Sequence, residues 1–335
     1  MKTISVVIPC YNEEKSITEM YERLLILFQG PLQLYDYEII FVDDCSPDAT
    51  WYEIKKMCEL DDKVKGVHNA KNFGFTRNVF ATLTYGSGDA TFMLFGDLQD
   101  PPEVLVEFVE RWEQGYKVII GQKRHSDENK LLFALRTLYY KIIGAFSDTK
   151  QLPHFNGFGL YDRMFIDVVR QLKDSQPYLK GVVAEFAMNQ CIIQYDQKVS
   201  KRGKSGFNFM KYYDVAMIGI TSYTKTLMRM ATFVGAILGL LCVLFSIFVF
   251  INKLLNWSTY PAGTASIMIG IFFLGAVQLF FIGVLGEYIL GINTRTMRRP
   301  LVVVDERLNF GSTTDKDTAQ QEKEESGNKW ETIQS

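Results

Sequence analysis

The sequence predicts an α/β domain with a mostly parallel sheet, followed by amphipathic interface helices and a two-helix transmembrane hairpin. In the first 120 or so residues, short apolar runs alternate with amphipathic helical patterns, as in βαβ units. Two later apolar runs, residues 230–251 and 267–289, are each long enough to cross the ~30 Å hydrocarbon core as a helix. Lys and Arg residues precede the first run and follow the second, and Lys253 is the only basic residue in the loop between them.

Each element of the N-terminal half follows from this periodicity. Strands are predicted at residues 4–8, 38–42, 64–68, 91–95 and 118–121. Helices are predicted at residues 17–28, 51–60, 76–85 and 103–115. Acidic or glycine-containing loops follow three of the strands, at residues 9–13, 43–48 and 97–102. The carboxyl ends of the strands are where open α/β sheets bind ligands, so a site is predicted at this edge.

The second half carries the membrane elements. Residues 207–229 are rich in aromatic and basic residues, which suits either an amphipathic helix in the membrane interface or an ordinary core helix. The excess of basic residues outside the hairpin predicts that both chain ends lie in the cytoplasm. Four parts are expected: an α/β domain (1–206), a juxtamembrane segment (207–229), a transmembrane hairpin (230–290) and a cytoplasmic tail (291–335). The tail is polar and is expected to be disordered after about residue 305.

The bulk properties exclude several classes of protein. A net charge of −2 gives no reason to expect a nucleic-acid partner. The five cysteines lack CxxC spacing, which favours separate reduced thiols. The N-terminus runs directly into a predicted strand and shows no signal-peptide pattern. The N-terminal half is therefore expected in the cytoplasm.

The loop after the first strand reads Pro9-Cys10-Tyr11-Asn12-Glu13. It lacks the GxGxxG pattern of dinucleotide sites, which disfavours NAD chemistry. An aromatic ring, an amide and a carboxylate suit stacking on a base and hydrogen bonding to a ribose. The alternative is a strand-to-helix turn in which Asn12 is the helix N-cap.

The loop after the second strand carries two adjacent carboxylates, Asp43 and Asp44. They repel each other unless a donor group or cation relieves them, so a nucleobase or ribose is a suitable partner. The alternative is a capped turn in which Asp48 is the helix N-cap.

The third loop reads Asp97-Leu98-Gln99-Asp100-Pro101-Pro102. Alternating spacing predicts that Asp97 and Gln99 point to one side, where their oxygens suit Mg²⁺ or Mn²⁺ together with substrate phosphates. Asp100, before the two prolines, is expected to start the next helix.

These motifs together resemble family-two glycosyltransferases of the GT-A fold, a Rossmann-like architecture. The resemblance rests on Pro-x-Tyr-Asn-Glu, Asp-Asp-x-Ser, Asn72-Phe73-Gly74 and Asp-Leu-Gln-Asp-Pro-Pro-Glu, which occur in that order. Residues 273–289 narrow it to bacterial polyprenyl-phosphate glycosyltransferases of the bactoprenol glucosyltransferase type, which are relatives of dolichol-phosphate mannose synthase. The resemblance covers roughly residues 1–304.

The resemblance assigns roles to particular residues. It implies nucleotide-sugar contacts from Pro9, Tyr11, Glu13 and Asp44. It implies a divalent ion, Mg²⁺ or Mn²⁺, at the catalytic Asp97 with help from Gln99.

The same resemblance places the acceptor phosphate on basic residues. Arg124 is implied as a second catalytic residue that meets the phosphate, and Arg pairs with phosphate in a bidentate way. Arg136 is either a second such residue or part of a solvated helix face. Arg202 and Ser205 fall in a basic loop that clamps phosphates or binds anionic lipid headgroups.

Two positions depart from the pattern of many relatives. Phe95 stands where they have the first Asp of Asp-x-Asp, and Gly157 stands where they have an Asp often proposed as a base. A phosphate with a second pKa of about 6 is already mostly dianionic at neutral pH and needs no strong base. The loss of the base therefore favours a lipid phosphate over a sugar hydroxyl as acceptor. Asp162 is expected to pair with Arg163 or to cap a helix.

The expected function is inverting transfer of a hexose, glucose above all, from UDP-glucose or a related nucleotide-diphospho-sugar to polyprenyl (undecaprenyl) phosphate. The reaction is expected at the cytoplasmic face of a bacterial inner membrane, in contact with membrane lipids, and a homo-oligomer is left open. Mannose, N-acetylglucosamine or another sugar is the nearest alternative. A processive synthase is disfavoured because Phe108 occupies the Gln position of Gln-x-x-Arg-Trp. A non-catalytic membrane scaffold is the alternative that Phe95 and Gly157 support.

Overall fold

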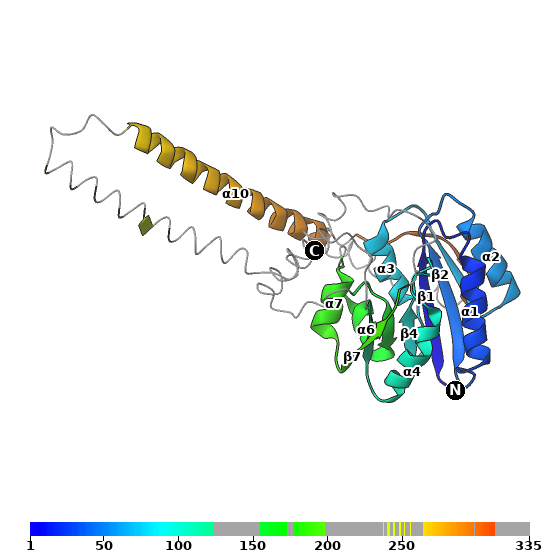
Figure 1. Ribbon diagram of the computed structural model, residues 1–335. Helices are drawn as coiled ribbons and strands as arrows, with labels where there is room; N and C mark the ends of the chain where they lie inside the picture. Colours follow the sequence, from blue (N-terminus) through cyan, green and yellow to red (C-terminus); the bar gives the residue numbers. More distant parts are fainter. Residues whose placement is uncertain are drawn as a thin grey trace, which may run out of the picture.

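The computed structural model describes residues 1–123, 155–172, 174, 177–197, 264–297 and 299–311, with seven further positions between 237 and 255. These residues form a sheet domain and a long helix that extends away from it (Figure 1). The strands are β1 (Thr3–Cys10), β2 (Asp36–Asp43), β3 (Val64–Asn69), β4 (Ala90–Met93), β5 (Val118–Lys123), β6 (Gly159–Asp162), β7 (Gln190–Tyr195) and β8 (Val304–Leu308). The helices are α1 (Ile17–Gln29), α2 (Thr50–Leu60), α3 (Phe75–Thr84), η1 (Pro102–Val104), α4 (Leu105–Glu113), α6 (Arg163–Gln171), α7 (Leu179–Phe186) and α10 (Thr264–Thr296).

The strands form one sheet in the order β7-β5-β6-β4-β1-β2-β3-β8. Strands β1 to β4 pair in parallel, whereas β6 runs antiparallel to both β4 and β5, and β8 runs antiparallel to β3. The mostly parallel α/β sheet predicted from the sequence is thereby confirmed.

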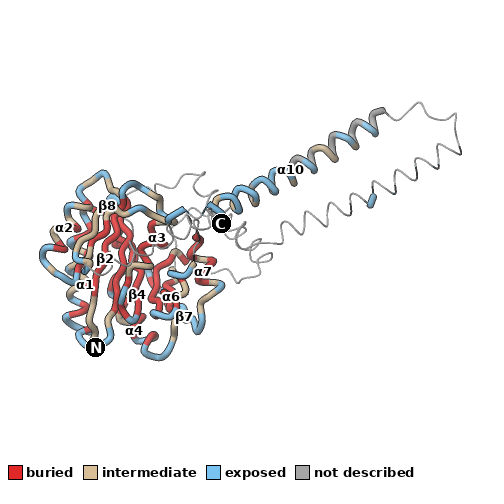
Figure 2. The backbone as a smooth tube through the Cα atoms, turned by 180° about the vertical axis from the view of Figure 1, so that it is seen from behind, coloured by how far each residue is buried: buried red, intermediate tan, exposed pale blue. Residues whose placement is uncertain are grey.

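The central strands are apolar along most of their length because helices cover the sheet. α1 packs against α2 and η1, whereas α3 packs against α6, which in turn contacts α7. Figure 2 shows the buried backbone concentrated in the strands, with the exposed residues around them. Parallel strands covered on both faces show continuous apolar runs, as β1 does from Ile4 to Cys10 apart from Ser5 and Pro9.

Strand register brings the predicted loops to one edge. Cys10, the last residue of β1, pairs with Asp43 at the end of β2, and Asp43 pairs with His68 near the end of β3. β4 lies beside β1 on the side away from β2, and its last residue, Met93, pairs with Val7 of β1. The loops that follow β1, β2 and β4 therefore leave the sheet from the same side.

The C-terminal part differs from expectation in one respect. The composition predicts disorder after about residue 305, but residues 305–308 belong to β8, which adds to the sheet edge beside β3. The polar composition is misleading because an edge strand needs only part of its surface buried: its residues are half-buried or exposed. The end of the tail, from residue 312, lies outside the described residues.

The predicted second span is helical, within the 33-residue α10. Residues 207–229, and all but a few positions of the first predicted span, lie outside the described residues. Among the helices that the structure describes, none meets the combined requirements of length and apolarity for crossing a membrane.

Candidate active site

The loop after β1 is held by the side chains of the β2–α2 loop. The backbone N–H groups of residues 12–14 donate in order to Ser46 Oγ at 3.0 Å, Thr50 Oγ1 at 2.7 Å and Asp48 Oδ2 at 3.3 Å. Asn12 itself has a φ of 59°, in the left-handed region that Asn tolerates better than most residues. Asn12 is not the N-cap of α1, because that position belongs to Ser16. The loop is therefore a fixed turn whose backbone donors are already used.

The predicted nucleotide contacts on this loop have different surroundings. Pro9 is buried within β1, whereas Tyr11 is 41% exposed. Glu13 is buried, and its Oε2 accepts a hydrogen bond from Ser16 Oγ at 3.0 Å. A Cβ on Gly96 would lie 3.2 Å from Glu13 Cγ, so the missing side chain at Gly96 lets the two loops touch. Glu13 consequently packs close to the backbone that leads into the Asp97 turn.

Asp44 is buried and ties three segments together. Its Oδ1 accepts from Asn69 Nδ2 at 2.9 Å and from the Phe73 N–H at 3.0 Å, and its Oδ2 accepts from the Gly74 N–H at 2.9 Å. The carboxylate thus fixes the turn that leads into α3. A carboxylate has about four acceptor positions, and these bonds use three of them.

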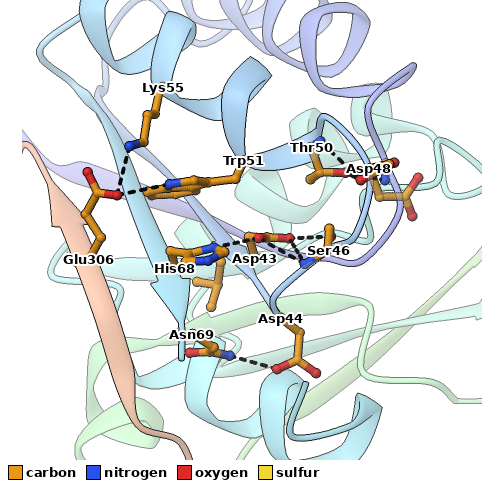
Figure 3. A network of polar contacts seen from close by, with 12 residues as sticks. Asp43, Asp44, Ser46, Asp48, Thr50, Trp51, Lys55, His68, Asn69 and Glu306 are labelled. Carbon is orange, nitrogen blue, oxygen red and sulfur yellow. Dashed lines mark hydrogen bonds and ion pairs between the residues drawn. The ribbon is translucent and has the colours of Figure 1, made fainter. Parts of the chain in front are cut away.

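Asp43 is fully buried beside His68 and Ser46 (Figure 3). His68 Nδ1 lies 2.7 Å from Asp43 Oδ2, and the Ser46 hydroxyl and N–H both donate to the carboxylate. Burial raises the pKa of Asp43 above its ordinary value, although the bonds from Ser46 and His68 act in the opposite direction. Asp48 is not the N-cap of α2, contrary to the alternative reading, because that position belongs to Ala49 and has no side-chain cap. Asp48 Oδ1 instead accepts from the Thr50 N–H at 3.1 Å, within the turn that precedes the helix.

Asp97 and Gln99 do lie together, but not because of strand alternation. β4 ends at Met93, and Leu98 has a φ of 57°, so the segment is a turn. Gln99 Nε2 donates to Asp97 Oδ2 at 2.6 Å, and the Gln99 N–H donates to Oδ1 at 3.2 Å. Because the amide nitrogen faces Asp97, the amide oxygen is the atom of Gln99 that could ligate a cation. Within the described residues no group of three or more His, Cys, Asp or Glu side chains is placed to hold a metal ion.

Asp100 does not start a helix, contrary to expectation. The next helix, η1, begins at Pro102 without a side-chain cap. Asp100 is instead 1% exposed and accepts hydrogen bonds from Tyr195 Oη at 2.6 Å, Gln197 Nε2 at 3.1 Å and Asn156 Nδ2 at 3.3 Å. The Asp97 turn is therefore anchored to β7 and to the segment before β6.

The charge of this cluster is partly balanced by Lys123 at the end of β5. Lys123 Nζ donates to Gln197 Oε1 at 2.8 Å. Burial raises the pKa of Asp100, while the positive charge of Lys123 and the Tyr195 hydroxyl pull it down. Asp97 adds to the upward shift through like-charge repulsion. Asp97, Asp100 and Lys123 therefore belong to one electrostatic unit at this edge of the sheet.

The two residues that depart from the family pattern, Phe95 and Gly157, lie close together. Phe95 is 8% exposed, and its ring stacks on Phe75 with centroids 5.7 Å apart. Gly157 has a φ of 110°, and a Cβ there would lie 3.0 Å from Leu179 Cδ2 and 3.7 Å from Phe95 Cζ. An apolar contact therefore occupies the place where two carboxylates are expected in many relatives.

Asp162 has a structural role. Its Oδ1 caps α6 by accepting from the Met164 N–H at 3.0 Å, which confirms the capping alternative. Its Oδ2 accepts from Trp112 Nε1 at 2.8 Å and from Lys117 Nζ at 3.0 Å. Among the described residues Asp162 pairs with Lys117 and not with Arg163, whose Nε lies 3.9 Å from Asp167 Oδ1.

The predicted acceptor-phosphate residues lie outside the described residues; they are Arg124, Arg136, Arg202 and Ser205. Two residues that support the site, His68 and Trp51, are not indicated by the sequence motifs. His68 lacks metal-ligand spacing, and Trp51 fits an ordinary helix pattern. The signal that could have found His68 is its place near the end of the third predicted strand, next to the end of the second.

Comparisons with known proteins bear on this geometry. Residues 5–168 match the family described as glycosyl transferase family 2. An uncharacterized glycosyltransferase of Synechocystis, sll0501, is 32% identical over 304 residues, which cover 90% of this chain and 95% of the relative. The chain belongs to glycosyl transferase family 2.

This glycosyltransferase is similar to further relatives over the same length. The bactoprenol glucosyl transferase of Shigella phage SfV is 31% identical over 302 residues, or 90% of this chain and 97% of that protein. Among solved structures, mannosyl-3-phosphoglycerate synthase from Rubrobacter xylanophilus is 15% identical, with 70% of this chain and 75% of that chain covered and a TM-score of 0.45.

Proposed function

We propose that this glycosyltransferase moves glucose, with inversion, from UDP-glucose to polyprenyl phosphate at the cytoplasmic face of a bacterial membrane. The observation that carries the proposal is the similarity to proteins named bactoprenol glucosyl transferase. That similarity runs over 302 residues, more than the sheet domain of residues 1–206 can hold, so it extends into the apolar C-terminal half. The matched length therefore includes both the loops proposed for the donor and apolar segments proposed to span the membrane.

The donor nucleotide fits the edge formed by the β1, β2 and β4 loops. Tyr11 offers an exposed ring for the base, while Glu13 and Asp44 supply carboxylates beside it. Asp44 retains one acceptor position for an N–H or O–H group of the nucleoside. The fixed turn at residues 12–14 costs little further ordering when the nucleotide binds, because its backbone donors are already engaged.

A divalent cation fits next to Asp97. Mg²⁺ typically uses one or two protein oxygens and takes its remaining ligands from substrate phosphates and water. Asp97 with the amide oxygen of Gln99 matches that pattern, and the hydrogen bond between the two side chains holds them as a pair. The ion would offset the charge that builds on the leaving diphosphate. Asp100 and its partners keep the turn in position for this role.

The acceptor is proposed to be an already ionised phosphate. The position of the base in many relatives is Gly157, and the three described atoms nearest to a Cβ there belong to the apolar side chains of Leu179, Phe95 and Val79. A phosphate oxygen can attack the anomeric carbon without losing a proton to the enzyme. Lys123 ends β5 close to Asp100, and Arg124, the next residue in the chain, is proposed to hold the phosphate. Most of the catalysis would then be positioning and charge stabilisation.

The membrane arrangement is part of the proposal. The two apolar runs, 230–251 and 267–289, form a hairpin with both ends in the cytoplasm, as the basic residues around them favour. Residues 207–229 are proposed to line the inner interface, and Arg202 and Ser205 are proposed to bind lipid phosphates. A reporter fused after Ser335 is expected on the cytoplasmic side, and an external reporter would contradict this orientation.

The proposal is tested with membranes that contain the full chain. They are incubated with polyprenyl phosphate and a panel of nucleotide sugars in Mg²⁺ or Mn²⁺, and the lipids are analysed by mass spectrometry. UDP-glucose is expected to give a polyprenyl-phospho-hexose, and Asp97→Ala is expected to abolish it. Asp62→Ala, which removes an exposed carboxylate away from the site, is the matched control and should retain activity. Transfer from another donor only would revise the sugar, and no transfer from any donor would favour a scaffold.

A further inference from the structure

The C-terminal strand β8 is attached firmly to the sheet domain. It pairs with β3 so that Glu306 lies opposite His68, and the Ala70 N–H donates to the Val303 carbonyl at 2.9 Å. Beyond the strand, Asn309 Nδ2 donates to the carbonyls of Cys58 and Val64 at 2.7 and 2.8 Å. The chain therefore returns from α10 to a defined place on the sheet edge.

From β8, Glu306 reaches across to α2. Its Oε2 accepts a hydrogen bond from Trp51 Nε1 at 3.1 Å and lies 2.8 Å from Lys55 Nζ (Figure 3). The Trp51 ring in turn stacks on His68, with centroids 4.9 Å apart and planes 26° apart. A Cβ on Gly66 would approach the Trp51 ring to 3.1 Å, so the absence of a side chain there gives the ring its place on β3.

From His68 the contacts continue to the donor loop. His68 Nδ1 contacts Asp43, the Ser46 hydroxyl and N–H donate to Asp43, and Ser46 Oγ accepts from the Asn12 N–H. A parallel support comes from α2 itself, since Thr50, the neighbour of Trp51, accepts from the Glu13 N–H. Every step is a hydrogen bond or a ring stack. The network reaches the turn that carries Tyr11.

We infer that β8 positions the donor-nucleotide loop, residues 11–14, through Glu306, Trp51, His68, Asp43 and Ser46. These are positioning residues, because none of them needs to touch the reacting atoms. The inference rests on the proposed function only in assigning the loop to the donor nucleotide. It means that a strand encoded after the apolar segments completes the support of a site encoded before them.

The physical reason is that the turn needs external support. Asn12 is held in a left-handed conformation, which costs free energy and persists only where the surrounding contacts compensate for it. Ser46 can hold the Asn12 N–H only while Asp43 fixes the serine, and the buried Asp43 is itself fixed by its contact with His68. Trp51 restricts the His68 ring on one face, and Glu306 restricts Trp51.

The first test measures the loop without any substrate. Hydrogen exchange, followed by mass spectrometry on the full chain, reports opening of the amides of residues 12–14. His68→Ala removes the central contact, and Trp51→Phe keeps a ring on His68 but removes the Nε1 donor. Exchange in this peptide is expected to accelerate at least about threefold in both variants. Asp305→Asn, on the exposed side of the same strand, is the control and should leave the rate unchanged.

The second test measures the donor. UDP binding is followed by calorimetry, and KM for UDP-glucose, KM for polyprenyl phosphate and kcat are measured separately. His68→Ala and Trp51→Phe are expected to raise the UDP dissociation constant and the donor KM by about tenfold and about threefold, with kcat and the acceptor KM within about twofold of wild type. Glu306→Gln, which keeps an acceptor for Trp51 but loses the pair with Lys55, should show a smaller effect in the same direction.

The outcomes separate the inference from the proposed function. Unchanged exchange of residues 12–14 in His68→Ala overturns the inference, and so does an equal loss in all kinetic constants, which would indicate general destabilisation. If the wild-type chain transfers no hexose, the proposed function fails, while exchange and UDP binding still decide whether β8 supports the loop. Faster exchange with unaltered UDP affinity would overturn the link to the donor.

Discussion

Replacing Gly157 tests the reason why this position lacks a carboxylate. Its φ of 110° lies in a region that L side chains rarely adopt, and a non-glycine residue there costs about 1–3 kcal/mol. The new Cβ would also meet Leu179 Cδ2 at 3.0 Å, which forces the end of that side chain to move. Such overpacking adds about 1 kcal/mol. Gly157→Ala is therefore expected to destabilise the chain by about 3 kcal/mol.

Gly115 supplies a matched control. It has a φ of 97°, but nothing lies within 4 Å of the position that a Cβ would take there, so Gly115→Ala carries the backbone strain without the contact. Its expected cost is about 2 kcal/mol. For a domain of this size, 1 kcal/mol shifts the melting temperature by about 2–4 °C. Thermal unfolding of the full chain in mild detergent should thus fall by about 6–12 °C for Gly157→Ala and about 4–8 °C for Gly115→Ala.

The functional half of this prediction uses Gly157→Asp. Because the proposed acceptor phosphate is already ionised, restoring the carboxylate should not raise kcat. Equal melting temperatures for Gly157→Ala and wild type would refute the structural reasoning. A rise of kcat by about tenfold in Gly157→Asp would refute the argument that no base is needed.

Three further predictions concern single side chains. Burial alone would raise the pKa of Glu38, but bonds from Lys65, Ser5 and Ser87 lower it overall, so its stabilising effect is present at neutral pH and is lost as the pH falls through the lowered pKa. Glu38→Gln should lower the free energy of unfolding by about 2 kcal/mol at neutral pH. Below pH ~4.5 the free energy of unfolding, measured with denaturant, should fall less steeply with pH than in wild type, and an unaltered pH dependence would contradict this. Tyr195→Phe removes a hydrogen-bond donor from the buried Asp100 and should lower the free energy of unfolding by about 1–2 kcal/mol in the same assay. It should also raise the Mn²⁺ concentration needed for half-maximal transfer, and an unchanged metal requirement would argue against a link to the Asp97 turn. Tyr11→Ala should raise the donor KM about tenfold while Tyr11→Phe stays near wild type, since the ring and not the hydroxyl is proposed to stack; equal effects would exclude stacking.

Much of the fold was predictable because the central strands are apolar along most of their length. The runs at residues 4–8 and 38–42 match β1 and β2 to within a few residues, and the helices between them follow the same pattern. The edge that carries the site was also predictable, since parallel strands bring their carboxyl ends together. Strand β8 was not, because an edge strand with polar residues resembles a disordered tail in composition.

The individual contacts within the site were less predictable. Alternation along a strand correctly predicts that Asp97 and Gln99 lie together, but the cause is different. A turn with a left-handed Leu98 and a side-chain hydrogen bond bring the two residues together. The local pattern at Asp100 predicts a helix start, whereas its partner Tyr195 is 95 residues away in the sequence. A local pattern carries no information on such a partner.

The sequence by itself determined the family, the parallel sheet and the residue types at its carboxyl edge, because apolar periodicity and short motifs are local properties of the chain. Only the tertiary structure decided which of those residues are already bound to one another. Asp44 is engaged by the turn before α3, Phe95 fills space beside Gly157, and Glu306 reaches Trp51 from 255 residues away. These contacts depend on the order of strands in the sheet, and strand order is set by how the whole chain buries its apolar surface.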